Sequence, residues 1–179
     1  MTPTLRYSLI YGGLASIVLC AFIAVTGLLN HSVKWVATEA FGYSVMLVAL
    51  SFVFVGVKRY RDVEGGGVIK FWRALGLGLL IALIAGVAYT LAWEIYLALS
   101  HADFLSGWIK AELAKDRASG MSAAALAKEI AKFDAIRAAY ANPLIRMGMT
   151  FGEVAPVGVL VALASAGLLR FSRFLPARG

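Results

Sequence analysis

The sequence predicts an all-α membrane protein with four transmembrane helices and an amphipathic helical hairpin between the third and fourth. Of the 179 residues, 61% are hydrophobic and only 15% are charged, which is too apolar for a soluble domain of this size. Four apolar runs are each long enough to cross about 30 Å of hydrocarbon, which takes roughly 20 helical residues. The runs are apolar on every face, as expected of spanning helices and not of spanning strands.

The four spans are expected at about residues 7–29, 36–57, 71–99 and 147–169, within a single membrane domain that covers residues 1–179. The first run is longer than the apolar region of a signal peptide. It also lacks a convincing cleavage site, so we expect it to be a retained anchor.

An amphipathic segment, residues 100–146, separates the third span from the fourth. Asp103 is the expected N-cap of a first helix, Gly120 its end, and Ser122 the N-cap of a second helix. Pro143 should break the second helix before the last span. The simpler interpretation is a helix pair that rests on lipid headgroups, and the alternative is a lid that binds a partner.

The charge pattern predicts the orientation in the membrane. The chain has a net charge of +7, and its basic residues gather beside the spans. They occupy the linker between the second and third spans and the C-terminal tail, as Lys58, Arg59, Arg61, Lys70, Arg73, Arg170, Arg173 and Arg178. The positive-inside rule therefore predicts that the N- and C-termini both face the cytoplasm. We find no nucleic-acid-binding motif, so the positive charge indicates lipid contact and not nucleic acid.

Small residues recur at helical spacing in the spans and predict close helix packing. Gly78, Ala82 and Gly86 form such a stripe in the third span, and Gly148 and Gly152 form one in the fourth. Similar spacing in the first span joins Gly12, Ser16, Cys20 and Ala24. These stripes predict a compact bundle of four helices.

Three glutamates, Glu39, Glu94 and Glu153, lie inside the apolar runs near the outer surface. An acidic side chain at the middle of a membrane costs about 2.5 to 3.5 kcal/mol on insertion scales. Glu39 is expected about one turn inside the second span, Glu94 about one and a half turns before the third ends, and Glu153 about two turns into the fourth. The sequence thus predicts one acidic layer in the outer leaflet.

Such a layer is a candidate binding pocket. Three converging carboxylates could not all stay ionised and unpaired, so protons or cations would have to bind. Tyr89, Thr90 and Tyr96 could donate hydrogen bonds there, and Pro156 should leave the carbonyl group of Gly152 without its usual helical donor. The alternative for each glutamate is a hydrogen-bonded residue that fixes helix packing.

A divalent metal ion is a second candidate ligand of this layer. His31 and His101 lie at its rim, and imidazole together with carboxylate suits zinc, iron or manganese. The chain has no His-x-x-x-His or Glu-x-x-His spacing. The simpler interpretation places both histidines at the membrane interface.

Three functions follow from these candidates. The first is an outer-leaflet acidic pocket for a proton, a metal ion or a cationic solute; transport through it would call for a homodimer. The second is an assembly or accessory subunit whose buried glutamates pair with a membrane protein partner. The third, an intramembrane enzyme, ranks last because no nucleophile elbow and no His-Glu-x-x-His motif is present, so we expect no catalysis.

Residues 56–62 (GVKRYRD), 67–72 (GVIKFW) and 150–160 (TFGEVAPVGVL) together resemble a family of small bacterial four-span membrane proteins, catalogued as domain of unknown function 4199. The resemblance covers nearly the whole chain and implies a four-helix architecture in a bacterial membrane. It includes Glu153 and Pro156 in the last span. The family has no established activity, so the resemblance implies no catalytic residue.

Overall fold

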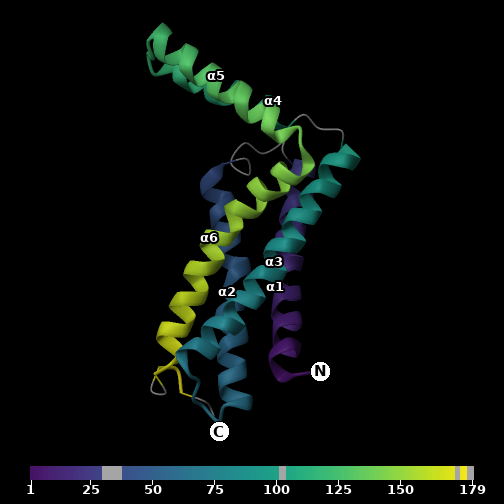
Figure 1. The fold of residues 1–179 in the computed structure, drawn as a ribbon, viewed down its shortest axis with the longest axis vertical. Coiled ribbons are helices and arrows are strands. Elements are labelled where there is room, and N and C mark those ends of the chain that lie inside the picture. Colours follow the sequence, from purple (N-terminus) through teal and green to yellow (C-terminus); the bar gives the residue numbers. More distant parts are fainter. Residues whose placement is uncertain (30–37, 101–103, 172–173, 177–179) are drawn as a thin grey trace. The chain divides into compact units, whose positions relative to one another are not determined.

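A computed structural model describes residues 1–29, 38–100, 104–171 and 174–176. These residues form helices and turns and no strand, which confirms the all-α fold class. The helices follow one another as α1 (Pro3–Leu29), α2 (Glu39–Glu64), α3 (Phe71–Ser100), α4 (Phe104–Ala118), α5 (Ala123–Tyr140) and α6 (Pro143–Leu169). Among them, α1, α2, α3 and α6 are long and apolar enough to cross a membrane (Figure 1).

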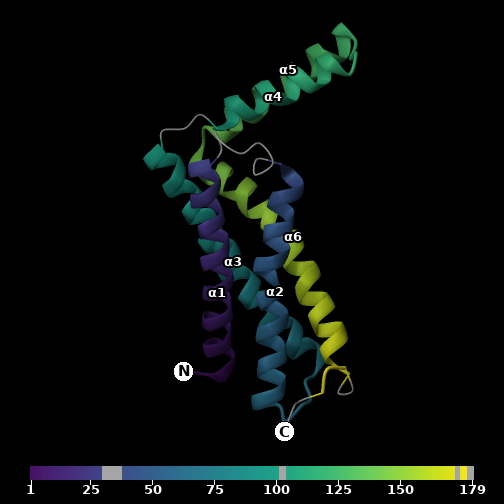
Figure 2. The same ribbon diagram turned by 180° about the vertical axis from the view of Figure 1, so that it is seen from behind.

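The chain divides into two compact units. One unit comprises Met1–Trp93 and Phe151–Gly179, and the other comprises Glu94–Thr150. The first unit is a bundle of α1, α2, most of α3 and most of α6. Figures 1 and 2 show that α1 begins and α6 ends at the same end of this bundle, which we call the termini end.

The interior of the bundle is built from small and branched apolar side chains. Its most completely buried members come from all four helices and are Ala15, Leu19, Ala49, Leu50, Val53, Val57, Ala74, Leu77, Ile81, Ala85, Val154, Ala162, Ala166 and Leu169. The large apolar side chains on the outside of the helices remain exposed, as the surface of a lipid-embedded bundle requires. The burial pattern therefore supports the membrane assignment independently of hydropathy.

Glycines allow α3 and α6 to pack closely. A Cβ atom added at Gly78 would lie 3.1 Å from the Cβ atom of Ala162, and one added at Gly158 would lie 2.9 Å from that of Ala82. At Gly86 the added atom would lie 2.8 Å from the ring of Phe151. The added atom at Gly158 would overlap Ala82, the one at Gly78 would lie closer to Ala162 than most real Cβ contacts, and the one at Gly86 would require the Phe151 ring to move. The predicted role of the small residues in the third span is confirmed.

The matching prediction for the fourth span is not borne out within the described chain. At Gly148 and Gly152 no described atom lies within 4 Å of an added Cβ atom. The small residue of α6 that packs against α3 is Gly158 instead. The reason is the rotation of α6 about its axis, which turns Gly152 away from the bundle.

Replacing Gly158 by leucine should destabilise the bundle by about 1 to 3 kcal/mol, because extra carbon atoms must displace Ala82. The measurement is the thermal midpoint of the detergent-solubilised protein. Gly76→Leu is the matched control, since no described atom lies within 4 Å of a Cβ atom added at Gly76. Equal midpoints for the two variants would contradict the close packing of α3 and α6.

The helix α1 starts at Pro3 and not at residue 7, and both boundaries of α2 differ from the prediction. The helix α2 starts at Glu39 because the extended Thr38 caps it, with its hydroxyl oxygen accepting a hydrogen bond from Phe41 N at 3.4 Å. It continues to Glu64, beyond the predicted end at residue 57, and ends where Gly65 N and Gly67 N donate to Arg61 O at 3.1 and 3.0 Å. Polar residues thus extend the helix past the apolar run.

The helix α6 starts at Pro143 and not at residue 147. Asn142 precedes it and accepts a hydrogen bond from Leu144 N through its Oδ1 atom at 3.0 Å. Proline suits the first helical position because its fixed φ matches the helix and its missing N–H needs no acceptor there. Hydropathy alone missed this first turn because it contains Arg146.

The predicted helical hairpin is present as α4 and α5. The rings of Trp108 and Phe133 meet edge to face with centroids 5.6 Å apart, and Ile109 is buried beside them. Gly120 has a φ of 77° after the end of α4, and Ser122 caps α5 by accepting a hydrogen bond from Ala125 N at 3.3 Å. Both predicted boundaries are confirmed, whereas Asp103 lies outside the described residues.

Candidate functional site

Glu94 forms an ion pair with Arg146 inside the unit Glu94–Thr150. Arg146 Nε donates to Glu94 Oε1 at 2.8 Å, and Arg146 Nη2 donates to Oε2 at 2.5 Å. The two side chains are only 19% and 20% exposed. The guanidinium also lies 5.5 Å from the centre of the Tyr140 ring. This bidentate geometry is the strong form of a carboxylate pair, so the charge of Glu94 is neutralised within the chain.

Glu39 is the first residue of α2. We expected Glu39 about one turn inside the second span, whereas among the described residues Thr38 caps α2 and the candidate span begins at Ala40. The side chain of Glu39 lies outside the described residues, as do His31 and His101. Within the described chain no three His, Cys, Asp or Glu side chains are arranged to hold a metal ion. The metal site at the two histidines remains a prediction.

Glu153 lies on the outward face of α6. Its neighbours on that face, Gly152 and Pro156, are also exposed, whereas Val154 and Gly158 point into the bundle and are buried. Among the described residues, the Glu153 carboxylate has neither a hydrogen bond nor an ion pair. It differs in this respect from Glu94.

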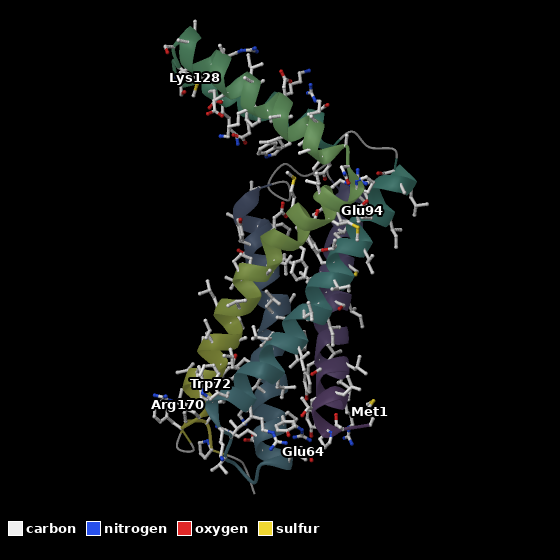
Figure 3. The ribbon with its side chains drawn as sticks, in the orientation of Figure 1. Met1, Glu64, Trp72, Glu94, Lys128 and Arg170 are labelled. Carbon is white, nitrogen blue, oxygen red and sulfur yellow. The ribbon has the colours of Figure 1, made fainter. Side chains whose placement is uncertain are left out.

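Glu153 also lies farther from the start of its helix than expected, because α6 begins before the predicted span. It follows Pro143 by ten residues (153 − 143) in a helix of 27 residues, which is about 15 Å along the axis at 1.5 Å per residue. Glu94 precedes the end of α3 at Ser100 by six residues (100 − 94), or about 9 Å. Figure 3 labels Glu94 near this end and Trp72 near the start of the same helix. Of the three glutamates, Glu153 is farthest from the end of its helix.

Pro156 lies inside α6 and has no backbone N–H. The carbonyl oxygen of Gly152, four residues earlier, therefore lacks the donor that a regular helix would supply. Because Gly152 has no side chain and the space beside it is open, this carbonyl group can be approached from outside the bundle. The predicted consequence of the proline thus falls on the same face as Glu153.

The three predicted hydrogen-bond donors of α3 are divided between the two units. Thr90 is buried and its hydroxyl donates to Gly86 O at 2.9 Å, so its proton is used within the helix. Tyr89 is buried in the bundle, and Tyr96 is half-buried in the unit Glu94–Thr150. Their assignment to a binding pocket stays a prediction.

Sequence reasoning missed the role of Arg61, which it treated as a topology signal. Its side chain is completely buried at the termini end. Arg61 Nε donates to Asp62 Oδ1 at 2.8 Å, Nη1 to Phe174 O at 2.9 Å and Nη2 to Leu175 O at 2.5 Å. The Arg61 guanidinium therefore fastens the C-terminal tail to α2. Asp62 also pairs with Lys58, whose Nζ atom lies 2.5 Å from Asp62 Oδ2. No feature of the sequence distinguishes Arg61 from the neighbouring Arg59.

These features define a class: a helical membrane protein with four candidate spanning helices and a helical hairpin between the last two. The chain belongs to the family described as protein of unknown function (DUF4199), which matches residues 6–170. The resemblance seen in the sequence is therefore confirmed. Comparison with curated proteins and with solved structures found no match.

Proposed function

We propose that the protein is a non-catalytic accessory subunit of a bacterial inner membrane, which binds a membrane protein partner through Glu153. The observation that supports this function is the exposure of Glu153 on the outward face of a spanning helix. Lipid tails offer a carboxylate no hydrogen bond, and no described residue of this chain pairs with Glu153, which favours a polar group on another molecule. A partner helix supplies that group.

The pairing of Glu94 argues against the pocket of three carboxylates. Arg146 already provides the positive charge that such a pocket would take from a solute or metal ion. Binding a second cation at Glu94 would require the bidentate pair to open, leaving Arg146 without its acceptor. Glu153 has no such partner in the described chain, so it is the better binding residue.

The charges of the bundle favour a cytoplasmic termini end. Exposed basic residues gather there on α1, α2, α3 and α6, and Figure 3 shows Glu64, Trp72 and Arg170 near this end. Trp72 is exposed, as an interfacial anchor would be. The hairpin of α4 and α5 then belongs to the outer side.

A single cysteine reports this orientation. In a Cys20→Ala background, Val68→Cys should resist a membrane-impermeant thiol reagent in intact cells and react after the inner membrane is opened, because Val68 is exposed in the linker after α2. Mass spectrometry of the labelled protein gives the result. Ready labelling in intact cells would reverse the topology.

The Glu153→Gln variant tests the proposed function. Glutamine keeps the shape but removes the charge, so the variant should fold normally and lose most of the partner that co-purifies with the wild-type protein. Glu64→Gln is the matched control, since Glu64 is exposed at the termini end of α2. Quantitative mass spectrometry of gently solubilised membranes is the measurement.

Undiminished recovery of the partner with Glu153→Gln would refute the subunit role. The wild-type protein could instead show a shift in thermal midpoint with metal or pH that Glu153→Gln loses. That result would replace the subunit role with a cation-binding site at Glu153.

A further inference from the structure

We infer that the partner presents a membrane-spanning helix with a lysine or arginine side chain, and that this cation contacts both the Glu153 carboxylate and the Gly152 carbonyl group. The inference rests on the proposed function and adds the chemistry of the partner. It follows from the geometry of α6 and from the distribution of charge over the bundle.

The backbone of α6 is accessible from outside the bundle at Gly152. An added Cβ atom at Gly152 would meet no described atom within 4 Å, so another helix can approach the α6 backbone there. Leu160 and Leu163 are exposed along the same side of α6 and provide apolar contact for that helix. The face therefore offers a close backbone approach beside a longer apolar surface.

The same face carries two hydrogen-bond acceptors, the Glu153 carboxylate and the Gly152 carbonyl oxygen. Glu153 follows Gly152 directly, and Pro156 leaves the Gly152 carbonyl oxygen without its helical donor. An ammonium or guanidinium group has several N–H donors and no acceptor, so one cationic side chain can satisfy both oxygens. A single hydroxyl group, with one proton to donate, would satisfy only one of them.

A second copy of this chain is a poor partner for the face of α6 that carries Glu153. A two-fold axis along the membrane normal through this face would place two Glu153 carboxylates at the same depth, where like charges repel strongly in a low dielectric. The described basic residues of the bundle unit lie at the start of α1, at the end of α2, at or just before the start of α3 and just after α6, which is the termini end; they are Arg6, Lys58, Arg59, Arg61, Lys70, Arg73 and Arg170. The described bundle residues of a partner copy would therefore bring no cation to Glu153.

The experiment uses three synthetic spanning peptides built from leucine and alanine, identical except for a central lysine, glutamine or leucine. A central position suits Glu153, which lies about 15 Å along the axis of α6 from its start and well inside the helix. Energy transfer between labelled peptide and labelled full-length protein in lipid vesicles measures binding. The lysine peptide should bind wild-type protein about tenfold more tightly than the leucine peptide, as intramembrane polar pairs do.

Two variants make the result specific. Glu153→Gln should reduce binding of the lysine peptide to the level of the leucine peptide, and Gly152→Leu should weaken it by blocking the close approach. Glu64→Gln should bind like wild type. Circular dichroism confirms that each variant is folded.

Equal binding of the three peptides, or no binding of the lysine peptide, would show that the partner is not recognised through a cationic side chain. The subunit role itself would still be decided by the co-purification experiment. Preference for the glutamine peptide would indicate a neutral donor and also overturn the cationic partner. Survival of lysine-peptide binding in Glu153→Gln would show that the cation binds elsewhere.

Discussion

Arg146→Met should lower the free energy of unfolding by about 3 kcal/mol, the lower end of the cost of breaking a buried ion pair. The lower end applies because both side chains of the pair keep about a fifth of their surface exposed. The variant leaves the Glu94 carboxylate near the end of α3 without the two N–H groups that it accepts from. Unfolding in mixed micelles with increasing denaturing detergent measures the loss.

The double variant Glu94→Gln with Arg146→Met should be more stable than Arg146→Met alone, because it removes the stranded charge. Arg137→Met is the matched control. Its partner Asp134 is 3.5 Å away and both side chains are more than half exposed, so it should change stability by less than about 1 kcal/mol. Equal losses of unfolding free energy for Arg137→Met and Arg146→Met would show that the Glu94–Arg146 pair stabilises the protein no more than an exposed ion pair does.

Arg61→Met should release the C-terminal tail and destabilise the termini end by about 3 kcal/mol, because it leaves the carbonyl groups of Phe174 and Leu175 without donors and removes one of the two cations that pair with Asp62. Carboxypeptidase digestion followed by mass spectrometry measures the release at Phe174 and Leu175. The thermal midpoint reports the loss of stability.

Arg61→Lys should fail to restore the tail, since one ammonium group cannot reach the three acceptors that the planar guanidinium spans. Arg59→Met is the matched control, because Arg59 is exposed on the same turn of α2. A tail that stays protected in Arg61→Met would contradict the fastening role of Arg61.

The sequence predicted the helices but not their rotations. Gly86 and Gly152 occur in similar stripes of small residues, yet Gly86 packs against Phe151 while Gly152 faces outward. Hydropathy cannot distinguish them, because in a spanning helix the lipid-facing side is as apolar as the buried side. Which face packs is decided by the shapes of the neighbouring helices.

The polar contacts also could not be predicted from the sequence alone. Arg59 and Arg61 are two residues apart and chemically alike, but only Arg61 is buried, because the returning tail covers it. Glu94 and Arg146 are separated by 52 positions, so their pairing depends on how α3 and α6 come together. The sequence predicted the same site for Glu94 and Glu153, whereas in the structure Glu94 pairs with Arg146 and Glu153 is exposed on α6.

The most direct test of the subunit role is photo-crosslinking in native membranes from position 160 on the outward face of α6. A photoreactive amino acid at Leu160 should capture a second protein, and Glu153→Gln in the same chain should abolish that product. The same amino acid at Val48, an exposed position on α2, should yield lipid adducts only. A product from position 160 that persists in Glu153→Gln, or lipid adducts alone at that position, would contradict a partner bound through Glu153.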